Sequence, residues 1–180
     1  MKSEKKEGTL RLMTMGEIAM AQRVFGHSIS YNRVWIHCDS YLPFGLQANN
    51  YGMTPNGELW FRKELYRDDF SSSAVQDETK HLFIHEMGHV WQHQQGMWVR
   101  MRGLVSWAAS YSYQLDKDEL YDYSLEQQAS IIADYWWLLV YGLESWNSQK
   151  GINRVIQYRG TDRLQDIPML YKKIVTGRRD

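Results

Sequence analysis

Two histidines and an adjacent glutamate form the most chemically suggestive group in the sequence. His85-Glu86-Met87-Gly88-His89 matches the pattern H-E-x-x-H. On an α-helix, residues four apart lie about 40° apart around the axis and one turn along it, so both imidazoles can bind one metal ion. Glu86 lies about 100° from His85, too far around the helix to join the ligands easily but within reach of a metal-bound water. The spacing therefore predicts His85 and His89 as zinc ligands and Glu86 as the general base.

The same segment carries four histidines at four-residue spacing, so the metal-binding pair has to be chosen among His81, His85, His89 and His93. Only the pair His85 and His89 has a carboxylate directly after its first histidine. All four cannot share one ion, because His81 and His93 are about 18 Å apart along a helix axis. His81 and His93 are therefore predicted to flank or support the site.

A catalytic zinc ion needs three protein ligands and one open position. Thiolates cannot supply a ligand set, because Cys38 is the single cysteine. The longer pattern H-E-x-x-H-x-x-G-x-x-H is excluded as well, since Gln92 and Gln95 stand at its glycine and histidine positions. The third ligand is predicted to be Glu126, which opens a later helix among small residues. Asp134 is the alternative, either as the ligand or as a group that orients a ligand histidine.

Stabilisation of the transition state requires a hydrogen-bond donor aimed at the developing oxyanion. Four tyrosines lie just before the predicted Glu126 helix, namely Tyr111, Tyr113, Tyr121 and Tyr123. Tyr123 is taken as the catalytic donor, with Tyr121 as its alternative. The predicted strand over residues 58–62 is a candidate edge that pairs with an extended peptide substrate. Together these residues predict a zinc-dependent peptidase.

Three capping boxes, each a Ser or Thr followed three residues later by Glu or Gln, predict where helices begin. The predicted helices start after Thr14, Ser73 and Ser124, and they end at Gly26, Gly96 and Gly142. The second one carries the H-E-x-x-H motif, with apolar residues on the opposite face at Phe83, Met87, Val90 and Trp91. A last amphipathic helix is predicted within residues 152–175, broken near Pro168.

Two segments, residues 33–39 and residues 58–62, favour strands that can pair in a small sheet. Residues 97–123 show no clean period and are predicted to be irregular, and residues 1–9 a disordered tail. The expected fold is one α+β domain over residues 1–180, with a small sheet packed on the active-site helix and a mostly helical C-terminal half.

The charge balance and hydropathy of the sequence limit which classes of partner and which cellular location are expected. Twenty-one Lys and Arg balance twenty-one Asp and Glu, so no attraction to nucleic acid or to an anionic membrane is expected. The charged N-terminal residues lead into no apolar run, which predicts synthesis in the cytoplasm without a signal peptide. The longest mainly apolar stretch, residues 131–143, contains Asp134 and is short for a membrane span, so it is predicted to be a buried helix.

Several segments also resemble a known group of bacterial proteins. These segments are Thr14–Ala19, Tyr41–Leu46, Met53–Glu58, Phe83–Gln92 and Glu126–Gln128. They resemble the short Vgr-related proteins that carry the Rhs designation, and the metallopeptidase domain at the C-terminus of some VgrG spike proteins of type VI secretion systems. Two positions depart from the pattern: Gly88 stands where relatives often have Thr, and Ser130 stands where gluzincins place an acidic residue.

The resemblance implies a zincin-like, gluzincin-type fold with zinc on His85, His89 and Glu126. It also implies a toxin that the type VI system delivers into the periplasm of neighbouring cells, with a VgrG spike and a neutralising immunity protein as partners. Its substrate is then a protein or peptide. Two alternatives stay open: an amidase that acts on peptidoglycan stem peptides, and a non-catalytic adaptor of the secretion apparatus that keeps a structural metal.

Overall fold

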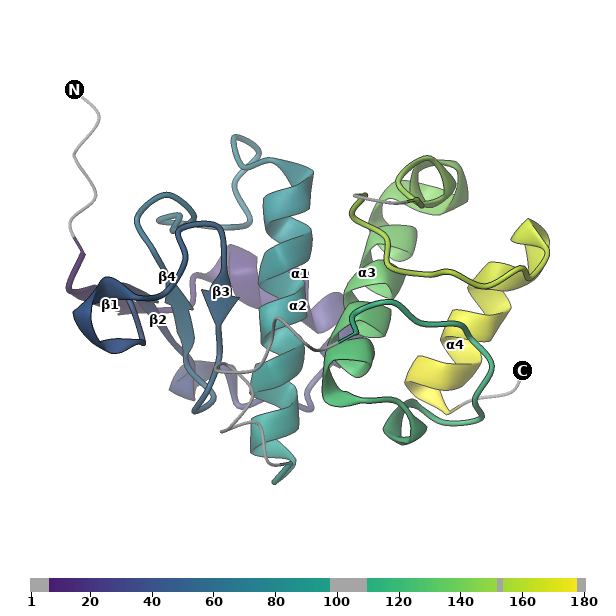
Figure 1. The fold of residues 1–180 in the computed structure, drawn as a ribbon, viewed down its shortest axis with the longest axis horizontal. Coiled ribbons are helices and arrows are strands. Elements are labelled where there is room, and N and C mark those ends of the chain that lie inside the picture. Colours follow the sequence, from purple (N-terminus) through teal and green to yellow (C-terminus); the bar gives the residue numbers. More distant parts are fainter. Residues whose placement is uncertain (1–6, 98–109, 152–153, 178–180) are drawn as a thin grey trace.

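The protein is an α+β structure in which one long helix lies between a small sheet and further helices. The computed structural model describes residues 7–97, 110–151 and 154–177. Its strands are β1 (Thr9–Leu12), β2 (Trp35–Cys38), β3 (Gly52–Met53) and β4 (Leu59–Phe61), and its α-helices are α1 (Met15–Phe25), α2 (Asp77–Gln94), α3 (Leu125–Ser148) and α4 (Ile167–Thr176). Figure 1 shows the sheet on one side of α2, with α3 and α4 on the other. The expected α+β class, the small sheet and the helical C-terminal half are confirmed.

The sheet is mixed and has the strand order β1-β2-β4-β3. β2 and β4 pair in parallel with Ile36 opposite Leu59, while β1 and β3 add antiparallel strands on either side. The predicted pairing of residues 33–39 with residues 58–62 is therefore confirmed. The prediction of β4 as an open edge is wrong, because the two-residue strand β3 covers it. Nothing in so short a segment, Gly52 and Met53, signals a strand in the sequence.

The predicted disordered tail over residues 1–9 is wrong in its last part. Thr9 belongs to β1 and pairs with Cys38. Glu7 accepts a hydrogen bond from Arg62 Nε at 2.7 Å. This hydrogen bond lowers the pKa of the Glu7 carboxyl more than burial raises it, so the pKa lies below its usual value. Residues 1–6 lie outside the described part of the chain. The tail prediction failed because β1 is held by partners distant in sequence.

Two of the three predicted capping boxes form. Thr14 caps α1 and Ser124 caps α3, each with the reciprocal bond from the third residue of its helix. The box at Ser73 does not form, since α2 begins at Asp77 after Gln76, which makes no side-chain cap. Val75 is buried, so the chain turns inward before the helix starts. A turn takes the place of the capping box: the Val75 N–H donates to the Ser72 carbonyl oxygen and the Ala74 N–H donates to the Ser72 hydroxyl oxygen.

The helix boundaries predicted at Gly142 and Pro168 differ from those in the structure, whereas the boundary at Gly26 does not. Gly26 ends α1 as predicted, at φ +52°. Gly142 breaks the helical geometry of α3 at φ +83°, but the helix resumes and ends at Ser148. Pro168 does not break the last helix and instead lies in the first turn of α4, where its missing N–H costs no hydrogen bond. Of the predicted irregular segment, residues 98–109 lie outside the described part, and residues 110–123 contain a short 3₁₀ turn and an isolated bridge from Tyr113 to Tyr158.

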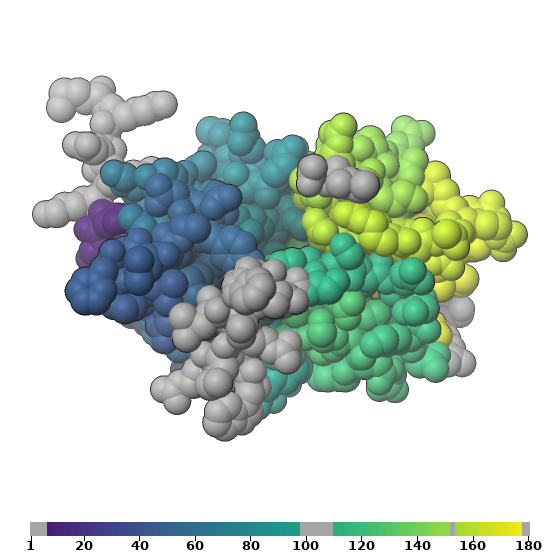
Figure 2. Space-filling view, viewed as in Figure 1, coloured from purple at the N-terminus to yellow at the C-terminus, as the bar shows by residue number. Residues whose placement is uncertain are grey.

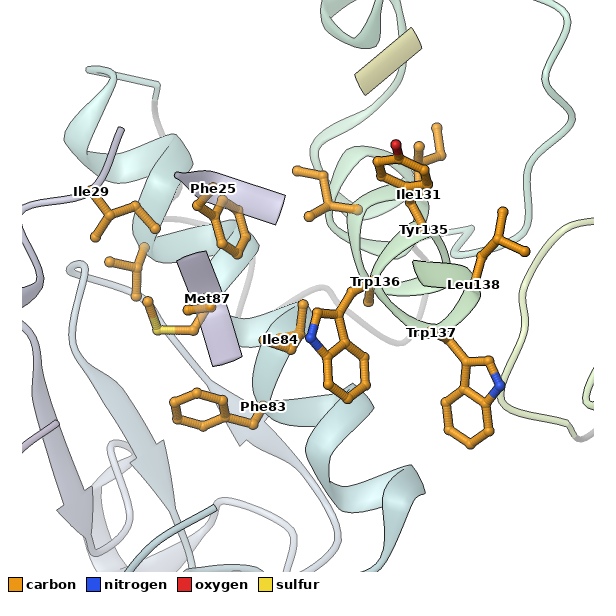
Figure 3. Close-up of a cluster of buried hydrophobic side chains, with 14 of the residues drawn as sticks. Phe25, Ile29, Phe83, Ile84, Met87, Ile131, Tyr135, Trp136, Trp137 and Leu138 are labelled. Atoms are coloured by element: carbon orange, nitrogen blue, oxygen red, sulfur yellow. The ribbon is translucent and has the colours of Figure 1, made fainter. Parts of the chain in front are cut away.

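Buried side chains of the sheet side and of α3 pack against α2 from both sides. On the sheet side, Phe83 stacks on Phe70 at 4.7 Å between ring centroids, and Phe70 in turn lies 4.9 Å from Phe61 of β4. On the other side, Figure 3 shows Ile84 of α2 and Trp136 of α3 pointing toward one another. Phe83, Met87 and Val90 are fully buried, as the predicted apolar face requires. Packing on both sides fixes the rotation of α2 about its axis, and with it the direction of its histidines.

Close contact between α2 and α3 depends on small residues. A Cβ atom on Gly88 would lie 3.0 Å from Cα and Cβ of Ala129, tighter than ordinary van der Waals contact. The two helices therefore approach each other closely at Gly88 and Ala129. The space-filling view in Figure 2 shows the N-terminal half on one side of the molecule and the C-terminal half on the other. The helix pair α2 and α3 belongs to both halves and joins them.

Candidate metal centre

Three predicted ligands meet where α2 faces the start of α3. Glu126 Oε2 lies 3.4 Å from His85 Nε2 and 3.2 Å from His89 Nε2. The potential ligand atoms of the three residues all lie within 4.8 Å of one another. Tetrahedral ligands about 2.0–2.2 Å from a zinc ion lie roughly 3.4 Å apart, so two imidazoles and one carboxylate at these distances fit zinc. The geometry brings together the three residues that the sequence named.

The two helices run antiparallel, and each presents a row of polar residues at four-residue spacing to the other. The α2 row is His89, His85 and His81, and the α3 row is Glu126, Ser130 and Asp134. Glu126 faces His85 and His89, and Asp134 faces His81 at 2.7 Å. All six side chains are buried. Helix periodicity places these residues in rows, and helix packing decides which members meet.

Gln92 fixes the orientation of His89. The Gln92 amide nitrogen donates to the carbonyl oxygen of Leu125 at 2.8 Å and to Gln128 Oε1 at 3.1 Å, so its oxygen must face the other way. That oxygen lies 2.8 Å from His89 Nδ1 and accepts its proton. His89 Nε2 then keeps a lone pair directed at the site, as a metal ligand requires. In the sequence, Gln92 had served only to exclude the longer zinc motif.

The charges within the site are coupled. Burial lowers the pKa of His89, but the hydrogen bond and negative charge of Glu126 outweigh it and raise this pKa to about 9. Burial raises the pKa of Glu126, but its hydrogen bonds to His85 and His89 outweigh that effect and hold the pKa well below its usual range. Glu126 is therefore a carboxylate at neutral pH and attracts positive charge to this position.

Glu86 lies beside the ligands and is held from the sheet side. Its Oε2 accepts a hydrogen bond of 2.7 Å from the Thr54 hydroxyl, and both side chains are buried. A Cβ atom on Gly52 would lie 2.9 Å from Cγ of Glu86. The strand β3 can therefore lie next to the Glu86 side chain only because residue 52 has no Cβ atom. Neither contact can be predicted from the sequence, because both join segments more than thirty residues apart.

The site opens into a cavity of about 250 Å³. Its lining combines β3 and its flanks with both helices and the C-terminal segment: Asn50, Tyr51, Gly52, Met53, Thr54, Pro55, His81, Leu82, His85, Glu86, His89, Tyr111, Glu126, Ser130, Val155 and Gln157. A cleft with an apolar lining and a few convergent polar groups is typical of small-ligand and substrate sites.

Among the four candidate tyrosines, the structure places Tyr111 at the cavity and Tyr123 elsewhere. The Tyr111 ring lies 5.7 Å from the His85 ring, and its hydroxyl contacts that of Tyr51. The Tyr123 hydroxyl instead accepts the backbone N–H of Lys117 at 3.0 Å, and Tyr123 does not line the cavity. Tyr123 is close to Glu126 in sequence, but it precedes the helix cap, where the chain points it away.

Asp134 does not orient a ligand histidine. Its Oδ1 lies 2.7 Å from His81 Nε2, while Oδ2 accepts the Tyr113 hydroxyl at 2.6 Å and the Gln157 N–H at 2.8 Å. Burial and the charge of Asp134 raise the pKa of Tyr113 well above its usual value. This second cluster joins α2, α3 and the C-terminal segment. His93 is exposed and does not line the cavity.

Fold and site together define an α+β protein with three residues that could hold a metal ion between two antiparallel helices. Its structure is similar to the effector domain of Pseudomonas aeruginosa VgrG2b, with a TM-score of 0.65 and 33% identity over 88% of this chain and 89% of that domain. The chain belongs to the family of this effector domain.

A curated relative agrees with that assignment. The type VI secretion system spike protein VgrG2b of Pseudomonas aeruginosa is 41% identical over 133 residues, which cover 69% of this chain. The matched region spans 13% of the length of the spike protein. No protein-family model matches the chain. Among the described residues, no helix has the length and apolar character needed to cross a membrane.

Proposed function

We propose that the chain is a zinc-dependent peptidase of the zincin-like, gluzincin type, in which His85, His89 and Glu126 hold the ion. The observation that carries the proposal is the spacing of 3.2 and 3.4 Å between Glu126 Oε2 and the two imidazole nitrogens, beside a cavity that also contains Glu86. A bound zinc ion supplies Lewis acidity and lowers the pKa of water. The residues of the chain account for the remaining steps.

Glu86 is the proposed proton carrier. Thr54 directs one carboxylate oxygen by its hydrogen bond, and the cavity lies in front of the side chain. In this position Glu86 can take a proton from water and deliver it to the leaving nitrogen of the amide. Tyr111 takes the role that the sequence assigned to Tyr123, since it lines the cavity and can donate its hydroxyl proton to the developing oxyanion.

Delivery by a type VI secretion system completes the proposal. The relatives are a type VI spike protein and its effector domain, which supports an effector role for this chain. The proposed partners are a VgrG spike and a neutralising immunity protein, and the proposed place of action is the periplasm of a target cell. A protein or peptide is the proposed substrate.

Replacement of Glu86 by Gln tests the enzyme role. The variant should keep its zinc and lose activity by roughly 10²- to 10⁴-fold, because only the proton carrier is removed. Growth of a sensitive bacterium that exports the chain to its periplasm, cleavage assays and metal analysis measure the outcome. Glu78→Gln is the matched control, since Glu78 is an exposed residue of the same helix.

The substrate assays separate the alternatives. Cleavage of proteins supports the peptidase, whereas release of stem peptides from purified peptidoglycan supports the amidase. An adaptor with a structural metal predicts equal behaviour of Glu86→Gln and the unaltered chain. That equality, with zinc bound in both, would overturn the enzyme proposal.

A further inference from the structure

Ser130 occupies the middle of the α3 row and has no partner. Its neighbours in the row, Glu126 and Asp134, face histidines of α2, but the Ser130 hydroxyl makes no hydrogen bond. The residue is 1% exposed. In the described part of the chain, four side-chain atoms are buried without a hydrogen-bond partner, and of these only Ser130 Oγ belongs to a residue that lines the cavity.

Two polar atoms at this end of the cavity already have hydrogen-bond partners. His81 Nε2 bonds Asp134, and the Gln157 side-chain nitrogen donates to the carbonyl oxygens of Arg154 and Val155. Leu82 and Val155 make the rest of the wall apolar. A ligand group in this part of the cavity therefore meets a largely apolar wall next to Ser130, whose hydroxyl has no hydrogen-bond partner.

A buried hydroxyl without a partner is costly, and native structures retain few of them. A hydroxyl both donates and accepts, so a neutral polar group is the partner that satisfies it without burying an unpaired charge. The Ser130 hydroxyl thus selects for a hydroxyl or a carboxamide against a methyl group of the same size.

We propose that Ser130, with Leu82 and Val155, forms a subsite for a neutral polar side chain, that of Ser, Thr, Asn or Gln, next to the scissile bond. The proposal rests on the peptidase function proposed above. Residues four apart on a helix are separated by about 6 Å along the axis. Neighbouring Cα atoms of a substrate are about 3.8 Å apart, so a short side chain beside a peptide bond held at Glu126 reaches Ser130.

Two measurements test the subsite. In the first, the zinc-loaded chain digests a random mixture of decapeptides, and mass spectrometry identifies the residues that flank each cleaved bond. We expect Ser, Thr, Asn or Gln to be enriched at one flanking position. In the second, the Glu86→Gln protein binds uncleaved peptides that differ only by Thr or Val at that position, and calorimetry measures both affinities.

Thr should bind about 5- to 10-fold more tightly than Val, as one neutral hydrogen bond predicts. Addition of Ser130→Ala should bring the two affinities within about twofold. Ser148→Ala, an exposed serine of the same helix, should leave the preference unchanged. Thermal unfolding of Ser130→Ala checks that the variant folds.

The two proposals fail in different ways. Cleavage by the zinc-loaded chain without enrichment at either flank, or a Thr preference that survives Ser130→Ala, overturns the subsite alone. Absence of any cleaved bond overturns the peptidase and the subsite together.

Discussion

Two clusters of histidine and carboxylate side chains lie between α2 and α3, and their carboxylates have different surroundings. Glu126 faces His85 and His89 across a space that opens into the cavity. Asp134 is fully buried and accepts hydrogen bonds from three partners, His81, Tyr113 and Gln157. Both clusters combine histidine with a carboxylate. The Glu126 carboxylate can still bind a cation, whereas both oxygens of Asp134 already have hydrogen-bond partners.

This difference shows how a carboxylate that could bind a metal ion can be distinguished from one that only stabilises the fold. A buried carboxylate whose oxygens are bonded to protein donors is satisfied and stabilises the elements that carry those donors. A buried carboxylate that faces imidazole lone pairs needs a cation, either a proton on a histidine or a metal ion. Glu126 belongs to the second kind, which is why its neighbour His89 has a raised pKa.

The largest expected effect concerns zinc. His89→Ala should reduce bound zinc to the background of the measurement, because only two ligands remain. His81→Ala should retain zinc, since Asp134 rather than the ion is its partner. Metal analysis of the purified variants measures this. Zinc lost from both variants would show that the two clusters are one site.

The next effect concerns folding. Asp134→Ala should lower the free energy of unfolding by about 3–5 kcal/mol, because the buried His81 and Tyr113 and the half-buried Gln157 N–H lose their acceptor. Glu126→Ala should lower it far less in chelator-treated protein, since its histidines line a cavity that water can enter. Denaturant titration of both variants gives the comparison. Equal losses would contradict the distinction drawn between the two carboxylates.

The smallest effect is the dependence of zinc binding on pH. The raised pKa of His89, about 9, means that the metal-free site holds a proton at neutral pH. Zinc must displace that proton, so affinity should rise about tenfold per pH unit up to about pH 9 and then level off. Competition with a chromogenic chelator at several pH values measures the slope. In Glu126→Gln, which lacks the charge that raises this pKa, the levelling should occur at lower pH.

Much of the local structure could be predicted from the sequence because its causes are local. Capping boxes at Thr14 and Ser124 form, and His85 and His89 share one face of α2. The failures have distant causes. The outer strands β1 and β3 exist only because β2 and β4 pair with them.

The candidate site divides in the same way. Helix periodicity by itself determined that His85 and His89 lie one turn apart with Glu86 beside them, and small residues in α3 allowed Glu126 to be predicted as their partner. Only the tertiary structure decided that Asp134 holds His81, that Thr54 and Gly52 shape the place of Glu86, and that Tyr111 reaches the cavity while Tyr123 does not. The physical reason is that spacing within a helix is fixed by its hydrogen bonds, whereas contacts between elements depend on how the whole core packs.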